Sequence, residues 1–128
     1  RALLTGDAYA PVLVDALARL PGNAAGRLRL DAVKLSHHGS RGNTSSDLVR
    51  AVDCRNWLVS TNGKIFHHPD GEAIARVLRD GGAGVQLHFN YRSECNDMWA
   101  ALGLQRKHDY TARYPANEGE GVCLDLDG

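Results

Sequence analysis

The stretch LDAVKLSHHGS (residues 30–40) joins an apolar run to a polar corner that carries two adjacent histidines. The run at residues 30–35 predicts a strand that ends where Ser36 begins the corner. Successive side chains of a strand point to opposite faces, so His37 and His38 serve one site only if the backbone turns there. Gly39 permits such a turn, because glycine adopts conformations that other residues avoid. The fold must therefore place the end of a strand at a polar, histidine-bearing corner.

Short apolar runs and helix-like segments alternate on both sides of this corner. Strands are expected at residues 2–5, 30–35, 56–60, 85–89 and 121–126. Helices are expected at residues 11–20, 44–52, 69–80 and 93–102, with Thr44 as the cap of the second, and a polar loop is expected at 105–119. The alternation of strands and helices predicts an α/β fold.

Length and composition are those of a single globular domain. With 128 residues it is long enough for one domain with a core and too short for two ordinary ones. Its 15 basic and 15 acidic side chains cancel, so no overall basic field indicates binding to nucleic acid or a membrane. No apolar run approaches the ~20 residues that span a bilayer, and we expect no membrane contact from this segment. Because Arg1 is followed at once by a strand-like run, we expect the sequence to begin inside a domain.

The three cysteines, Cys54, Cys95 and Cys123, are widely spaced and form no C-x-x-C pair. This usage is typical of small buried residues in a reducing compartment, and it favours the cytoplasm. One disulfide plus a free thiol remains an open alternative.

Polar residues follow three of the expected strands, at Gly6-Asp7, at residues 36–40 and at residues 60–63. The carboxyl ends of strands in an α/β sheet share one edge, where ligands usually bind. Asp7 and the His37-His38 corner are therefore expected to converge. Carboxylate and imidazole suit zinc or manganese, but two ligands alone do not hold a metal.

Each of these features also has a plain structural explanation. An aspartate after a glycine forms turns, and a histidine pair occurs in ordinary loops. The second pair, His67-His68, stands where the approach to a helix N-terminus is expected. His88 and His108 have no sequence partner and are assigned to structure or surface. Taken singly, these residues do not decide between a site and a polar loop.

The order of the pieces is more specific than any one of them. LLTGDA, a helix, VKLSHHGS, then WLVSTNG and HHPDGEAIARVL closely resemble the second half of the metallo-β-lactamase fold. The chain is most similar to the hydrolase domain of bacterial DNA-uptake channel proteins and their soluble relatives. The resemblance covers residues 1 to about 90 closely and the remainder up to Gly128 loosely.

This resemblance implies a site with two divalent metal ions, zinc ahead of manganese. Asp7 matches the aspartate that bridges the two ions, and His37 matches a terminal metal ligand. His38 and His68 match positions beside the metals and are the candidate catalytic residues, and Ser40 is the candidate substrate contact. The implied reaction is hydrolysis by a metal-activated water, with nucleic acid or a nucleotide as the favoured substrate.

The chain also departs from the family pattern, because it contains no H-x-H anywhere and so lacks the family's H-x-H-x-D-H motif. We therefore expect residues 1–128 to be the C-terminal half of a four-layer αββα sandwich, whose partner is the missing N-terminal half. The alternative is a metal-free scaffold or interaction module derived from the same fold. A doubly wound nucleotide-binding domain is disfavoured, since the chain has no G-x-G-x-x-G and no P-loop. The oligomeric state stays open.

Overall fold

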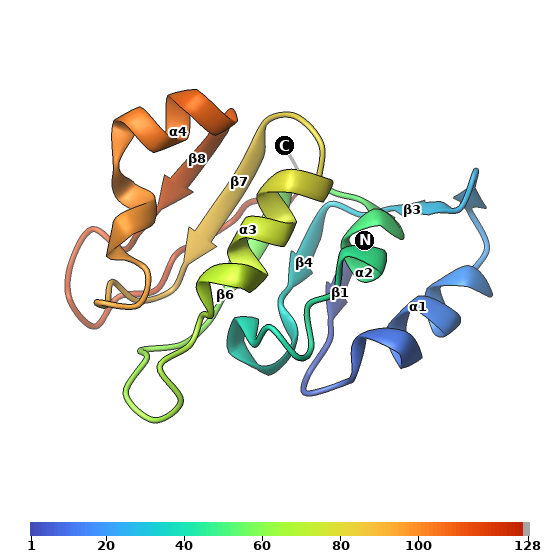
Figure 1. Cartoon of the computed structure of the whole chain (residues 1–128), viewed down its shortest axis with the longest axis horizontal. Helices are drawn as coiled ribbons and strands as arrows, with labels where there is room; N and C mark the ends of the chain where they lie inside the picture. Colours follow the sequence, from blue (N-terminus) through green and yellow to red (C-terminus); the bar gives the residue numbers. More distant parts are fainter. Residues whose placement is uncertain (127–128) are drawn as a thin grey trace.

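A five-stranded parallel sheet forms the centre of the molecule in the computed structural model, which describes residues 1–126 (Figure 1). The strand order is β1 (Ala2–Leu4), β4 (Ala32–Lys34), β6 (Asn56–Val59), β7 (Val85–Phe89) and β8 (Tyr110–Arg113), and every neighbouring pair is parallel. Helices connect these strands. The predicted α/β class is confirmed.

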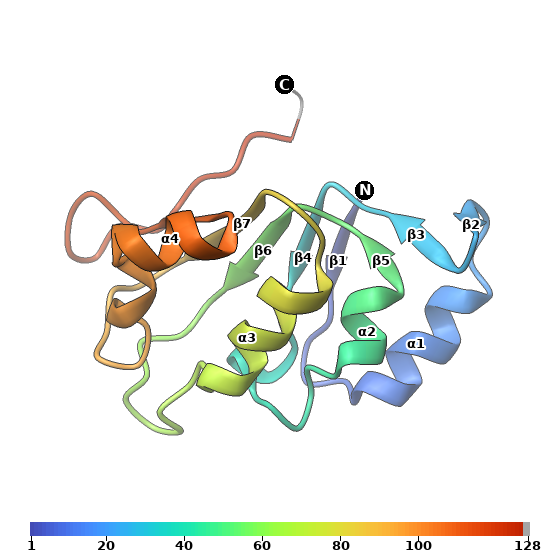
Figure 2. The ribbon, with the colours of Figure 1, turned by 45° about the horizontal axis from the view of Figure 1, so that its top comes forward.

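The strand order advances across the sheet in one direction, and this decides where the helices lie. Parallel crossovers are almost always right-handed, so connections that all step the same way put their helices on the same face. Figure 2 shows α1 (Ala10–Ala18), α2 (Ser46–Arg50) and α3 (Gly71–Asp80) on one side of the sheet. Helix α4 (Leu102–His108) packs beside β8.

A second, smaller sheet flanks the β1 side of the molecule. It pairs β2 (Asn23–Ala24) with β3 (Arg27–Arg29) in antiparallel fashion, and β3 with β5 (Val52–Asp53) in parallel. These strands are too short to show a periodic pattern, and the sequence predicted none of them.

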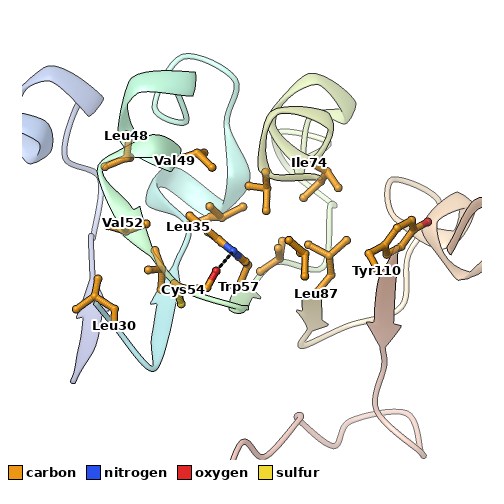
Figure 3. Packing of buried hydrophobic residues seen from close by; sticks show 14 of the residues in the cluster. Leu30, Leu35, Leu48, Val49, Val52, Cys54, Trp57, Ile74, Leu87 and Tyr110 are labelled. Carbon is orange, nitrogen blue, oxygen red and sulfur yellow. Dashed lines mark hydrogen bonds between the residues drawn. The ribbon is translucent and has the colours of Figure 1, made fainter. Parts of the chain in front are cut away.

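The core lies between the helices and the sheet face that they cover (Figure 3). Trp57 at its centre is fully buried, and its indole N–H donates to the Cys54 carbonyl at 3.1 Å. Leu87 reaches the core from the next strand and Ile74 from α3. Burying such side chains contributes about 1.5–3 kcal/mol each, and this anchors the strands that carry the loops described below.

The opposite face of the sheet carries no helix and is crossed by the C-terminal tail (Figure 2). Leu4 on this face is 75% exposed, and it borders a cavity of about 220 Å³ together with Leu58, His88 and Val122. The tail is held here by the Val122 N–H, which donates to the Asn90 side chain at 3.1 Å. His88 is buried, as expected for a structural histidine, and this burial lowers its pKa.

Three element predictions in the last third of the chain were wrong. The helix expected at residues 93–102 is a turn followed by a short 3-10 helix, η2 (Asp97–Ala100), and α4 begins only at Leu102. Helix α4 and β8 occupy residues 105–108 and 110–113 of the segment predicted as a loop at 105–119, and only residues 114–119 form the predicted loop. No strand forms at residues 121–126; this segment is the tail that crosses the uncovered sheet face.

Two smaller expectations also need correction. Helix α2 is capped by Ser45, whose hydroxyl accepts from the Leu48 N–H at 3.1 Å, and not by Thr44, which is fully buried. Of the three cysteines, only Cys54 is buried, while Cys123 is exposed, and all three thiols are free.

Within residues 1–126, no helix is long and apolar enough to cross a membrane.

Candidate functional site

Three loops meet at the carboxyl edge of the sheet, at residues 5–8 after β1, 36–43 after β4 and 60–70 after β6. The His37 N–H donates to the Gly6 carbonyl at 2.9 Å, and the Ser36 hydroxyl donates to the Ala8 carbonyl at 2.6 Å. In Figure 1 these loops lie together at the arrowhead ends of the strands. The predicted convergence of the Gly6-Asp7 corner with the histidine corner is confirmed.

The histidine corner bends more sharply than one glycine would allow. His37 (φ 44°), His38 (φ 59°) and Gly39 (φ 87°) all have left-handed backbone conformations within the short 3-10 element η1 (Ser36–Gly39). A side-chain-bearing residue in such a conformation costs about 1–3 kcal/mol, and such strain concentrates at functional sites. From the sequence, only Gly39 was expected to make this turn, and the left-handed conformations of His37 and His38 were not predicted.

Asn43 fixes the orientation of the His37 ring. The Asn43 amide N–H₂ donates to the carbonyls of Asp7 (3.2 Å) and Ala8 (3.1 Å), so its oxygen faces His37 Nδ1 at 3.4 Å. An oxygen neighbour requires the proton on Nδ1, which leaves the Nε2 lone pair of the neutral ring free. Asn43 is 5% exposed and so acts as a buried bridge between the Asp7 loop and His37.

The His38 ring is held in the same tautomer by a different loop. Its Nδ1 lies 2.6 Å from the Ser60 carbonyl, which can only accept, so Nδ1 carries the proton and Nε2 is again free. Histidines that bind metals usually donate the other ring N–H to a carbonyl or carboxylate in this way. Both half-buried rings are therefore prepared to offer Nε2 to a ligand, a metal or a proton.

His68 joins the cluster from the third loop. Its ring centroid is 5.3 Å from that of His37, and its Nδ1 lies 3.3 Å from an Asp70 carboxylate oxygen. The loop is fastened to the histidine corner by the Asp70 N–H, which donates to the Gly39 carbonyl at 3.0 Å. A Cβ at Gly39 would lie 2.8 Å from the Pro69 Cβ, so these two loops touch where only glycine fits.

The other two predicted site residues have different surroundings. Asp7 is exposed, and its main chain is connected to His37 through Asn43. Ser40 is half-buried in a local turn, where its hydroxyl accepts from the Gly42 N–H at 3.3 Å. The structure thus groups His37, His38 and His68 and brings the Asp7 loop against them, whereas Ser40 takes part in a turn of its own loop.

Phe66 is a site neighbour that sequence reasoning missed. Its ring lies nearly parallel to His68 (27°, centroids 6.0 Å apart) and edge-on to His37 (centroids 5.7 Å apart). The residue is nevertheless 62% exposed, and Ile65 beside it is 79% exposed. The sequence signal that could have revealed Phe66 is the apolar pair Ile65-Phe66 inside an otherwise polar loop.

The metal-binding capacity of these residues is partial. Within residues 1–126, no group of three or more His, Cys, Asp or Glu side chains is placed to hold a metal ion. A catalytic zinc ion takes about three protein ligands, so Asp7 and His37 alone do not make up such a site.

No family model, no curated protein and no solved structure matches this chain. The functional conclusion therefore rests on the residues and their geometry.

Proposed function

We propose that this chain forms part of a metal-dependent hydrolase of the metallo-β-lactamase type. Phosphodiesters of nucleic acids or nucleotides are the favoured substrates, ahead of carboxylic esters, thioesters and lactams. One observation carries the proposal: His37 and His38 are held at a strained corner in the tautomer that leaves Nε2 free, against the Asp7 loop. The order of the sequence motifs supports the family and the substrate ranking.

Asp7 and His37 are the proposed ligands from this chain, and the missing N-terminal half of the sandwich would provide the others. When bound, a pair of divalent cations lowers the pKa of a shared water toward neutrality and takes up charge on the phosphoryl oxygen. Asp7 would offer its carboxylate oxygens to these ions and His37 its Nε2.

The remaining residues of the chain have distinct proposed roles. His38, whose Nδ1–H is held by the Ser60 carbonyl, can accept or deliver a proton only at Nε2. Asp70 orients His68 in the same manner, so that His68 Nε2 faces away from this carboxylate. Ser40 is the proposed substrate contact and would have to exchange its local hydrogen bond for it.

The test uses the full natural protein. We expect elemental analysis to find about two divalent ions per chain, and bis(p-nitrophenyl) phosphate to be hydrolysed until a chelator removes them. Asp7→Ala should lose more metal than His38→Ala. Equal metal content in the wild type and both variants would contradict the ligand assignment.

A metal-free scaffold is the second candidate, and two observations favour it. The sequence has no H-x-H, and residues 1–126 contain no group of three potential ligands. A protein that binds no metal and hydrolyses no ester would support this candidate over the hydrolase.

A further inference from the structure

The loop after β6 presents an aromatic ring beside the histidine cluster. Phe66 lies nearly parallel to His68 and approaches His37 edge-on, so its ring borders the histidine cluster. A phenylalanine in a core is buried on all sides, yet this one is 62% exposed. Part of the ring is therefore open to solvent next to the residues proposed for chemistry.

The same loop also carries positive charge. Lys64 stands two residues before Phe66, and its exposed ammonium has no ion-pair partner within residues 1–126. Residues 62–68 contain no acidic side chain, although the whole chain is neutral. Lys64 lines a neighbouring cavity with Asn90 and Arg92. Single nucleotides and unpaired strands bind to exposed aromatic rings and to cations of the same surface, because the base stacks and the phosphate pairs with the charge.

We propose that Phe66 is a stacking platform that selects substrates with a planar ring next to the scissile phosphate, and that Lys64 contacts a phosphate of the same substrate. This inference rests on the proposed function and deepens it by naming a substrate class, nucleotides with an unpaired base. Phe66 then sets substrate binding and is not itself catalytic.

Calorimetric titration tests the platform without turnover. Adenosine 5′-monophosphate and ribose 5-phosphate, which lacks the base, are titrated into the full natural protein. We expect the nucleotide to bind roughly 5- to 150-fold more tightly, the usual contribution of one stacked base. Phe66→Leu should bring this ratio close to one, and Phe66→Tyr, which keeps a ring, should preserve it.

Ile65→Ala is the matched control, because Ile65 lies in the same loop and is even more exposed but has no ring. It should leave the ratio unchanged. Lys64→Ala should weaken both ligands alike. Circular dichroism and thermal melting of each variant check that the fold is retained.

Several outcomes overturn the inference. They are a wild-type ratio near one, no saturable nucleotide binding, a ratio that survives Phe66→Leu, or an equal fall in the ratio for Ile65→Ala, which would indicate a general apolar contact with the base and no specific stacking on Phe66. Hydrolysis of bis(p-nitrophenyl) phosphate, measured in parallel, separates the two proposals. Hydrolysis without base preference refutes only the platform, and base preference without hydrolysis refutes only the hydrolase.

Discussion

His37 and His38 are adjacent in the chain, yet their rings contact different loops. Left-handed backbone at both residues directs one ring to Asn43 and the other to the Ser60 carbonyl. Because each ring keeps Nε2 free, both histidines can offer this nitrogen to a ligand or a proton.

We predict that His37→Ala loses metal and activity together, because it removes a ligand. His38→Ala should keep its metal and lose rate by ~10²- to 10⁴-fold, the usual contribution of general acid–base help. Metal analysis beside phosphodiester hydrolysis on the full natural protein checks this. If His38→Ala strips the metal while His37→Ala retains it, the two roles are reversed.

Asn43 should matter for both stability and metal binding. Asn43→Ala leaves the Asp7 and Ala8 carbonyls and His37 Nδ1 without their partner, which should cost about 1–3 kcal/mol of unfolding free energy. Metal affinity should fall by about 10- to 100-fold, as expected when a group that orients a ligand is removed. Denaturant unfolding and metal titration provide the measurements.

Asn43→Asp is the matched variant, because it keeps an oxygen acceptor for His37 but replaces the amide donors with a carboxylate oxygen that faces the Asp7 and Ala8 carbonyls. It should recover a large part of the metal affinity but little of the stability. If both variants bind metal as the wild type does, Asn43 does not position His37.

At the scale of elements, the contact between the histidine corner and the loop before α3 depends on one glycine. Gly39→Ala would place a methyl group 2.8 Å from the Pro69 Cβ in a left-handed backbone. We predict a loss of about 1–3 kcal/mol of stability and disturbed packing of His68 against His37, measurable by thermal melting and by histidine NMR shifts. Gly71→Ala is the control, because nothing lies within 4 Å of its added Cβ; it should be neutral or stabilising. Equal effects would refute the contact.

Asp80 joins the C-terminal ends of α2 and α3, since its carboxylate accepts from Arg79 and from Arg50, each at 2.8 Å. The bond from Arg79 is the main cause that lowers the pKa of Asp80 below its usual range. A lowered pKa in the folded state stabilises the fold above about pH 4 and ceases to do so as pH falls through the folded value.

Asp80→Asn should therefore lower the unfolding free energy by about 1 kcal/mol at pH 7 and by less at pH 3. Denaturant unfolding at both pH values tests this. Asp15→Asn removes an exposed pair with Arg19 at the C-terminal end of α1 and should have a smaller effect, about 0.3–0.5 kcal/mol. A deficit for Asp80→Asn that does not shrink in acid would argue against the titration.

Sequence patterns predicted the elements that carry several apolar residues and missed those that carry only one or two, such as β3, β5 and β8. Strand β7 has the predicted bounds 85–89, and α3 begins at Gly71 within the predicted 69–80, because both bury apolar side chains at a regular period. Strand β8 reads Tyr-Thr-Ala-Arg at the sheet edge; Tyr110 and Ala112 alternate with exposed residues, but two apolar residues are too few for the pattern to stand out in the sequence. The convergence of Asp7 and His37 followed from strand ends sharing an edge, whereas Asn43 depends on a contact between distant loops that no local pattern encodes.

At the scale of the whole molecule, the helices cover one sheet face and leave Leu4 exposed on the other. An apolar face of this kind favours association. We predict that residues 1–128 alone aggregate or are stable only with a partner segment. Light scattering and thermal melting measure this, and a compact monomer that melts cooperatively would refute it.

A matched pair of variants tests whether association occurs through the uncovered face of the sheet. Leu4→Glu places a charge on the uncovered face and should reduce association. Leu20→Glu changes a leucine that is 48% exposed just beyond α1, away from this face, and should leave association unchanged. Equal effects would show that association does not involve the uncovered face.

The one-directional strand order has a consequence for how the chain can fold. Ala32 pairs with Ala2, Asn56 pairs with Ala32, and Gln86 pairs with Asn56, so each strand of the large sheet joins the one preceding it about 25–30 residues earlier. When a strand of this sheet has been synthesised, the strand that it pairs with is already present. The sheet can therefore be extended strand by strand from β1 to β8 while the chain is still emerging from the ribosome.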